Sequence, residues 1–122
     1  MKTCLIVDDS RVIRRVASKI FQDLGFETNE AENERNAMNA FVARPADIVL
    51  VDWDMPVMDG LEFAKRLRQL PGGDKAIVIF CTVENDVSHI QQALDASADE
   101  YIMKPFDGEI VRAKLLMLGM LG

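Results

Sequence analysis

Cysteine and histidine, the residues that most often hold zinc or pair as nucleophile and base, are scarce in this sequence. Cys4 and Cys81 are its only cysteines, and His89 is its only histidine. Each cysteine lies inside an apolar run with no second cysteine or histidine at metal-ligand spacing, so we expect two buried, reduced thiols. His89 lies among polar residues of an expected helix without a nucleophile at a useful spacing, which favours a surface role over catalysis.

Long hydrophobic runs and an excess of positive charge are also missing. The apolar runs are only a few residues long and no charged-then-apolar leader opens the chain, so we expect no membrane span, no secretory signal and a cytoplasmic location. Fourteen Lys and Arg stand against 20 Asp and Glu, which gives a net charge of -6. This balance argues against direct binding to nucleic acid and favours a protein or a small ion as partner.

Short apolar runs alternate with helical patterns along the whole chain. The expected strands cover residues 3–7, 27–31, 48–52, 76–81 and 100–103. Ser10 and Asn33 are good N-caps for the first two helices, and further helices are expected over 61–70, 86–96 and 107–118. Five strand-then-helix units without a linker predict one α/β domain over residues 1–122, with a single parallel sheet covered by helices on both faces.

The expected helices have apolar positions at helical spacing. In the first helix these positions are Ile13, Val16, Ala17, Ile20 and Leu24, in the second Ala37, Ala40 and Phe41, and in the last Ile110, Val111, Leu115 and Leu118. We expect these side chains to face the sheet.

Rossmann-like and flavodoxin-like winding both fit such a sheet. The Rossmann fingerprint requires a glycine-rich turn after the first strand, whereas residues 8–10 read Asp-Asp-Ser, which excludes a close backbone approach to a pyrophosphate. A Walker-type loop is also absent from the sequence. Neither of these phosphate-binding motifs is therefore available.

Polar residues stand where the expected strands end. Asp8 and Asp9 follow the first strand, Asp52 ends the third, Thr82 follows the fourth and Lys104 follows the fifth. The carboxyl ends of parallel strands share one edge of a sheet, where ligands bind, so these side chains should converge. Asp52 alone is as consistent with a turn or capping role as with chemistry; the convergence makes it a candidate nucleophile.

The charges of this set indicate a cation. Three carboxylates and one lysine sum to -2, which one divalent cation would balance, and oxygen ligands suit Mg²⁺ better than zinc. With Mg²⁺, the set suits transfer of a phosphoryl group to Asp52, with Lys104 neutralising the phosphoryl oxygens and Thr82 donating to one of them. An ionised carboxylate needs no general base.

The segments Leu-Ile-Val-Asp-Asp-Ser at 5–10, Val-Asp-Trp-Asp-Met-Pro-Val-Met-Asp-Gly at 51–60, Thr82, and Lys-Pro-Phe at 104–106 together resemble the receiver domain of two-component response regulators. The chain is most similar to stand-alone receivers of the chemotaxis CheY type. This resemblance implies a flavodoxin-like sheet of strand order 2-1-3-4-5 with five helices.

The resemblance also implies a phosphoacceptor and its donor. Asp52 would accept a phosphoryl group from a phosphohistidine on a sensor histidine kinase or a histidine phosphotransfer protein. Lys104 would pair with Asp52 or its phosphoryl group, and the Lys104–Pro105 peptide would be cis, an uncommon geometry in folded proteins.

The Mg²⁺ ligands follow from the same resemblance. Asp9, Asp52 and the backbone carbonyl of Asp54 would bind the ion directly, and Asp8 would act through a water molecule.

The resemblance further implies a switch. Thr82 would move toward the phosphoryl group and Tyr101 would turn into the vacated space. This movement would change the face that binds a downstream protein target, built by residues 86–96, 100–103 and 107–118. The alternative for Tyr101 is an ordinary half-buried strand tyrosine.

Three residues are expected to tune reaction rates. Val83 stands where the family usually has Ala, Ser or Gly, and its branched side chain should narrow the entrance to Asp52, slowing both phosphoryl transfer and loss. Asp54 and Glu84 occupy positions that tune autodephosphorylation in the family. Both are acidic, and the sequence does not give the sign of their effect.

The leading interpretation is a monomeric, phosphorylation-controlled binding module rather than an enzyme acting on other molecules. One alternative is the receiver part of a larger regulator with a DNA-binding or enzymatic output domain. A remote alternative is a Mg²⁺-dependent phosphatase of the haloacid dehalogenase type, suggested by Asp52-Trp53-Asp54. That family has its Asp-x-Asp motif on the first strand of a longer chain, whereas here the motif follows the third strand.

Overall fold

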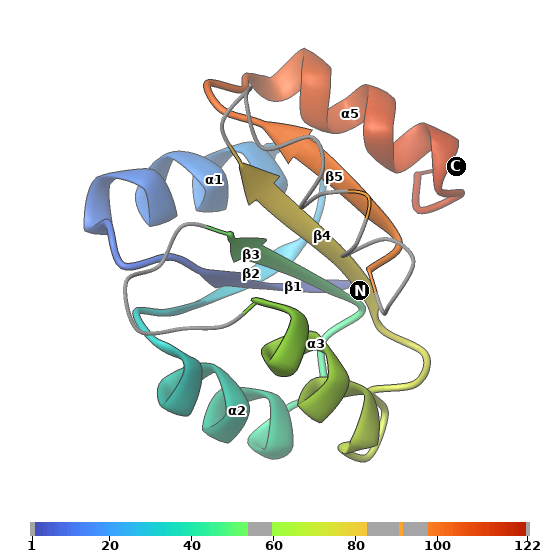
Figure 1. Ribbon diagram of the computed structural model, residues 1–122. Coiled ribbons are helices and arrows are strands. Elements are labelled where there is room, and N and C mark those ends of the chain that lie inside the picture. The colour runs from blue at the N-terminus through green and yellow to red at the C-terminus, as the bar shows by residue number, and fades with distance from the viewer. Residues whose placement is uncertain (1, 54–59, 83–90, 92–97, 122) are drawn as a thin grey trace.

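The computed structural model describes residues 2–53, 60–82, 91 and 98–121, and these residues form a five-stranded parallel sheet between two layers of helices (Figure 1). The strands are β1 (Thr3–Val7), β2 (Glu27–Ala31), β3 (Ile48–Asp52), β4 (Ile77–Thr82) and β5 (Glu100–Met103). Their order is β2-β1-β3-β4-β5, and every pair of neighbours is parallel. The flavodoxin-like fold predicted from the sequence is therefore confirmed.

The helices cover both faces of this sheet. Helices α1 (Arg11–Asp23) and α5 (Gly108–Met117) lie on one face, and α2 (Glu34–Ala43) and α3 (Gly60–Gln69) lie on the other (Figure 1). The helix expected over residues 86–96 falls outside the described residues. Among the described helices, none is both long enough and apolar enough to cross a membrane.

Side-chain caps fix where three helices begin. The Ser10 hydroxyl accepts a hydrogen bond from the Ile13 amide at 3.3 Å, and Asn33 Oδ1 accepts one from the Asn36 amide at 2.8 Å. These bonds satisfy amides that have no partner within the first helical turn. Asp107 caps α5 in the same way, accepting a hydrogen bond from the Ile110 amide at 2.9 Å.

The central strand β3 is buried along its whole length, as its unbroken apolar run predicts for a strand covered on both faces. Its side chains alternate between two core clusters: Ile48 and Leu50 pack on the side of α1 and α5, while Val49 and Val51 pack on the side of α2 and α3. The carboxylate of Asp52 therefore ends a rigid element.

In each of two helices, one residue predicted to face the sheet is exposed. Val16 of α1 is 45% exposed, whereas Ala17, which was also predicted to face the sheet, is buried together with Ser18 and Phe21. Consecutive helical residues point about 100° apart, so a face centred on Ala17 leaves Val16 at its rim. Ile110 is 42% exposed beside the buried Val111 for the same reason.

Strand β4 begins one residue later than predicted, at Ile77, and includes Thr82. The Ala76 carbonyl accepts a hydrogen bond from the Arg68 guanidinium.

Both cysteines are buried and free, as predicted.

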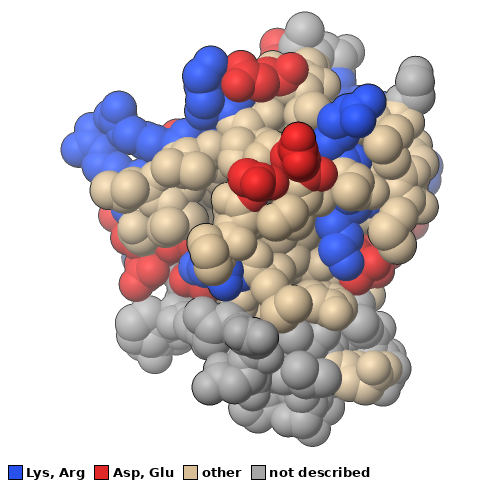
Figure 2. Space-filling model, turned by 90° about the horizontal axis from the view of Figure 1, so that it is seen from above, with Lys and Arg blue, Asp and Glu red and all other residues tan. Residues whose placement is uncertain are grey.

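The outer surface of the α1 and α5 layer carries charges of both signs. Figure 2, which looks onto this layer, shows basic side chains on both the left and the right of the face, with acidic side chains near the middle and at the rim. On the described part of this face, neither positive nor negative side chains form a continuous patch.

Candidate functional site

The carboxyl ends of two strands bring three carboxylates together. Asp8 directly follows β1, with Asp9 next to it, and Asp52 is the last residue of β3. One oxygen from each of the three side chains lies within 4.8 Å of the others. The parallel pairing of β1 with β3, Val7 opposite Val51, places these strand ends side by side.

The members of this cluster differ in burial. Asp8 is 4% exposed and Asp52 is 5% exposed, whereas Asp9 is exposed to solvent. Buried carboxylates are rare unless they are paired or bind a metal. The cluster therefore consists of two enclosed oxygen donors with a third at the mouth.

Lys104 lies between the two buried carboxylates. Its Nζ is 3.0 Å from Asp52 Oδ1 and 3.2 Å from Asp8 Oδ2. The Lys104 amide donates to the Thr82 carbonyl at 2.7 Å, which fixes the main chain after β5 to the end of β4. The Lys104–Pro105 peptide bond is cis, the geometry that the resemblance implies.

Burial and charge shift the pKa values of the groups around this lysine. Burial raises the pKa of Asp8 above its ordinary value, against the lowering effects of the Ser10 amide and Lys104. Burial alone would lower the pKa of Lys104, but the hydrogen bond and charge of Asp52, together with Asp8, raise it. Lys104 is therefore a cation at neutral pH.

Cys81 lies one residue before Thr82 on β4 and is 3% exposed. Burial, together with the neighbouring carboxylates and against the effect of Lys104, raises the pKa of its thiol well above the ordinary value. It is therefore a neutral core residue at physiological pH and a poor nucleophile.

Trp53 forms a wall beside Asp52. Its amide donates to the Cys81 carbonyl at 2.8 Å, and its ring meets Phe80 edge-on at 5.0 Å between centroids. Gly60, the first residue of α3, makes room for the indole, because a Cβ there would lie 2.9 Å from Trp53 Cε3. The tryptophan is thus packed against the strand that ends in Thr82.

The residues of the expected switch lie on β4 and β5. Thr82 is fully buried, and Tyr101 is half-buried on β5. Lys114 Nζ of α5 lies 4.7 Å from the centroid of the Tyr101 ring and 3.4 Å from Glu100 Oε1. The tyrosine ring therefore rests under a cation from the neighbouring helix.

Some of the predicted site residues cannot be placed. Asp54, Val83, Glu84 and His89 lie outside the described residues, so their expected roles stay predictions.

The structure also reveals a contact that the sequence did not indicate. Arg14 Nη1 of α1 donates to the Asp8 main-chain carbonyl at 2.7 Å, and Arg14 Nε donates to Glu30 Oε1 at 3.2 Å. The sequence pattern does not distinguish Arg14 from Arg11 and Arg15, because all three occur in the same basic helix.

The donor set fits a hard divalent cation. Three carboxylate groups that converge at one point offer the oxygen ligands that Mg²⁺ binds, through one or two direct carboxylates and retained waters. Asp8, Asp9 and Asp52 could therefore hold a metal ion.

Comparison with known proteins agrees with this geometry. Residues 4–116 match the family of response regulator receiver domains. The chain is 36% identical over 114 residues to the phosphate regulon transcriptional regulatory protein PhoB of Pseudomonas aeruginosa. The aligned region covers 93% of this chain and 50% of that protein. The chain thus spans half the length of this relative.

Two chemotaxis proteins match over nearly their whole length. The chain is 34% identical over 112 residues to chemotaxis protein CheY-3 of Vibrio cholerae, covering 91% of this chain and 86% of that protein. The solved structure of chemotaxis response regulator CheY4 of Vibrio cholerae superposes with a TM-score of 0.88 at 30% identity, covering 97% of this chain and 98% of that one.

Proposed function

The chain belongs to the response regulator receiver domain family of two-component systems, and from this premise we propose that Asp52 is its phosphoacceptor. Receiver domains are signalling switches rather than enzymes that turn over external substrates. In this proposal a phosphohistidine on a sensor histidine kinase or a histidine phosphotransfer protein donates the phosphoryl group. The modified domain then acts on a protein target.

One observation carries the proposal: the Asp52 carboxylate, at the buried end of the central strand, lies beside both an acidic cluster and an ammonium group. A purely structural Asp52–Lys104 ion pair would not need Asp8 and Asp9 next to it. A buried acid such as Asp8, with a further carboxylate at the mouth of the cluster, destabilises a protein unless positive charge neutralises it. Binding of a cation and acceptance of a phosphoryl group would together account for the clustering of these carboxylates.

The reaction assigned to Asp52 is a displacement at phosphorus. A carboxylate oxygen of Asp52 attacks the phosphorus of the donor's phosphohistidine, and a P–O bond forms while the P–N bond breaks. The bonding electrons stay with the imidazole nitrogen of the donor, which then takes a proton. Because Asp52 reacts as a carboxylate, the chain needs no general base.

The surrounding residues stabilise charge on the transferred group. Asp8, Asp9 and Asp52 would hold Mg²⁺, and the backbone carbonyl of Asp54 is proposed as a further ligand. When bound, the ion supplies positive charge next to the phosphoryl oxygens. Lys104 would supply a second positive charge, and the Thr82 hydroxyl would donate to one oxygen.

The output is proposed to be a change of surface. Thr82 and Tyr101 lie on neighbouring strands, and Tyr101 lies beside α5, so movement of either residue would reach the surface formed by β5 and α5. Modification can shift this equilibrium only by as much as it favours the active state. We propose a cytoplasmic, monomeric protein whose target binds this surface, with chemotaxis as one candidate process.

A fused output domain is the second candidate. The chain spans only half of PhoB, a transcriptional regulatory protein, so the same receiver could control a domain attached to it. The phosphoacceptor chemistry is identical in both cases.

Phosphoryl uptake tests the proposal. The protein is incubated with acetyl phosphate, with Mg²⁺ or with EDTA, and the intact mass is measured. We expect a single phosphoryl group on the wild type with Mg²⁺ and none with EDTA. Asp52→Asn should take up none, while Asp23→Asn, an exposed helix position, should behave as the wild type. Uptake by Asp52→Asn, or none by the wild type, would contradict the proposal.

A further inference from the structure

Asp8 is hydrogen-bonded at each of its four polar groups. Its amide donates to the Ala31 carbonyl at 3.1 Å, and its carbonyl accepts from Arg14 at 2.7 Å. Its Oδ1 accepts from the Ser10 amide at 2.8 Å, and its Oδ2 accepts from Lys104 at 3.2 Å. Three of these partners belong to the sheet edge or to the adjoining turn, and only Arg14 reaches Asp8 from within α1.

The contact from Arg14 also restrains the peptide group that leads to Asp9. A peptide group is planar, so the position of the Asp8 carbonyl oxygen sets the plane that carries the Asp9 amide and Cα. Asp9 itself is exposed and lies at the mouth of the acidic cluster. Rotation of the Asp8–Asp9 peptide plane would swing the Asp9 carboxylate away from Asp52.

Arg14 is itself held in place. Its side chain is only 13% exposed, and Glu30 of β2 accepts from its Nε. Glu30 in turn accepts from the hydroxyl of Ser18, a residue that is 5% exposed. This chain of contacts leaves the planar guanidinium few alternative orientations, and Glu30 balances its charge.

We propose that Arg14, fixed by Glu30, is a positioning residue for the cation site: it orients the Asp8–Asp9 peptide so that both carboxylates face Asp52. This inference rests on the proposed function in one respect, that the cluster binds Mg²⁺. Residues that orient metal ligands typically change affinity 10–100-fold when they are removed. Because Arg14 acts through the main chain, we expect about tenfold, the lower end of that range.

Whether Mg²⁺ binds more tightly or more weakly after Arg14 is replaced distinguishes a positioning role from a purely electrostatic one. Removing a positive charge near a divalent cation should tighten binding if charge alone matters. Loss of the contact to the Asp8 carbonyl should weaken binding instead. A purely structural role for Arg14 would lower the unfolding temperature and leave the Mg²⁺ affinity of the folded protein unchanged.

The test is a Mg²⁺ titration followed by fluorescence, checked by calorimetry. Trp53 is the only tryptophan and adjoins Asp52, so its emission reports on the site. We expect Arg14→Gln to raise the Kd for Mg²⁺ about tenfold. Arg14→Lys keeps the charge but lacks the fork that reaches both the carbonyl and Glu30, so its Kd should fall between those of the wild type and Arg14→Gln.

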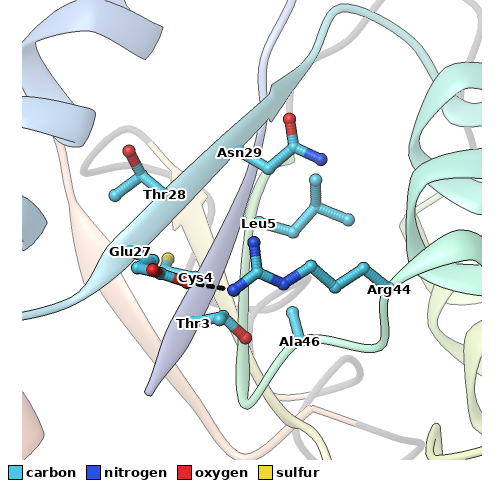
Figure 3. Close-up of a pocket in the computed structure, with 8 residues that line it drawn as sticks. All are labelled: Thr3, Cys4, Leu5, Glu27, Thr28, Asn29, Arg44 and Ala46. Atoms are coloured by element: carbon cyan, nitrogen blue, oxygen red, sulfur yellow. Dashed lines mark hydrogen bonds and ion pairs between the residues drawn. The ribbon is translucent and has the colours of Figure 1, made fainter. Parts of the chain in front are cut away.

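Arg44→Gln is the matched control. Arg44, the C-cap residue of α2, pairs with Glu27 at the other end of the same strand β2 (Figure 3), so this variant loses the same kind of ion pair and the same charge. Glu27 is paired in register with Thr3, at the opposite end of the sheet from Asp8. We expect the wild-type Mg²⁺ affinity in Arg44→Gln.

Each result has a definite meaning. Unchanged or tighter binding in both Arg14 variants would overturn the positioning role while leaving the proposed function intact. Equal weakening in Arg44→Gln would overturn it as well, since the loss of affinity would then not depend on the contact with the Asp8 carbonyl. Absence of Mg²⁺ binding by the wild type would overturn both. If Arg14→Gln does not fold, as judged by circular dichroism, Arg14→Lys decides the matter.

Discussion

Lys104 Nζ lies 3.0 Å from Asp52 Oδ1 and 3.2 Å from Asp8 Oδ2, so one ammonium group joins two buried carboxylates from the ends of neighbouring strands. The pair Lys104–Asp52 spans three strands of the sheet, β3 to β5, and the amide of the same lysine is bonded to the end of β4. A positive charge is thus held beside the proposed phosphoacceptor before any phosphoryl group arrives. Such preorganised charge is the main means by which proteins stabilise a transferring phosphoryl group.

Replacing Lys104 by Met should separate cation binding from phosphoryl transfer. Mg²⁺ should bind at least as tightly as in the wild type, because a competing cation has been removed from the cluster. Phosphoryl uptake from acetyl phosphate should slow by about a hundredfold, a typical effect of removing one charge-stabilising donor. Lys19→Met, at an exposed helix position, is the control. A wild-type rate of uptake in Lys104→Met would show that the lysine has no part in the transfer.

Asp8→Asn should stabilise the metal-free protein and weaken its metal site. The pKa of Asp8 is raised in the folded protein, mainly by burial. Its contribution to stability is therefore present below the ordinary pKa of about 4 and is lost as the pH rises through the folded-state value. At neutral pH in EDTA, Asp8→Asn should unfold at a higher temperature than the wild type, and the difference should shrink toward pH 4.

The same variant should bind Mg²⁺ about tenfold more weakly, and in the wild type Mg²⁺ affinity should fall as the pH drops toward the raised pKa of Asp8. Thermal unfolding in EDTA and Mg²⁺ titration measure these two effects. Lower stability of Asp8→Asn at neutral pH would refute the idea that the ionised Asp8 carboxylate costs stability in the metal-free state.

Lys114 should bias the position of Tyr101. Its ammonium lies 4.7 Å from the centre of the tyrosine ring, and such a contact contributes about 0.5–1 kcal/mol at a partly exposed site. Lys114→Gln should shift the ring toward the state produced by beryllofluoride and Mg²⁺, while Lys114→Arg should not. Tyr101 is the only tyrosine, so its ring resonances in an NMR spectrum report the change. Identical resonances in all three proteins would argue against this bias.

Val83 is predicted to slow both gain and loss of the phosphoryl group, because a branched side chain should narrow the entrance to Asp52. Hydrolysis of the phosphorylated protein should be faster in Val83→Ala, measured as the decay of the phosphorylated form after the donor is removed. An equal decay rate in the two proteins would remove the basis for this role.

The strands β1, β3 and β4 were predictable because each is a short apolar run in a sheet that helices cover on both faces. Asp52 and Thr82 could be placed at one edge from topology alone, since parallel strands align their carboxyl ends. The caps Ser10 and Asn33 were also visible in the sequence, because their side chains act within a few residues of themselves.

The parts that were missed depend on packing between distant segments. The exposure of Val16 depends on the rotation of α1 against the sheet, which the apolar pattern alone does not fix. The contact of Arg14 with the Asp8 carbonyl depends on Glu30, a residue of the neighbouring strand. Neither relation leaves a local signature in the sequence.

The most direct test of the account is to locate the modified residue. The protein is treated with acetyl phosphate and Mg²⁺, the acyl phosphate is reduced with borohydride, and the site is mapped by peptide mass spectrometry. The account predicts reduction at Asp52 alone, abolished by EDTA. Modification of Asp8, Asp9 or any other carboxylate in place of Asp52 would contradict it.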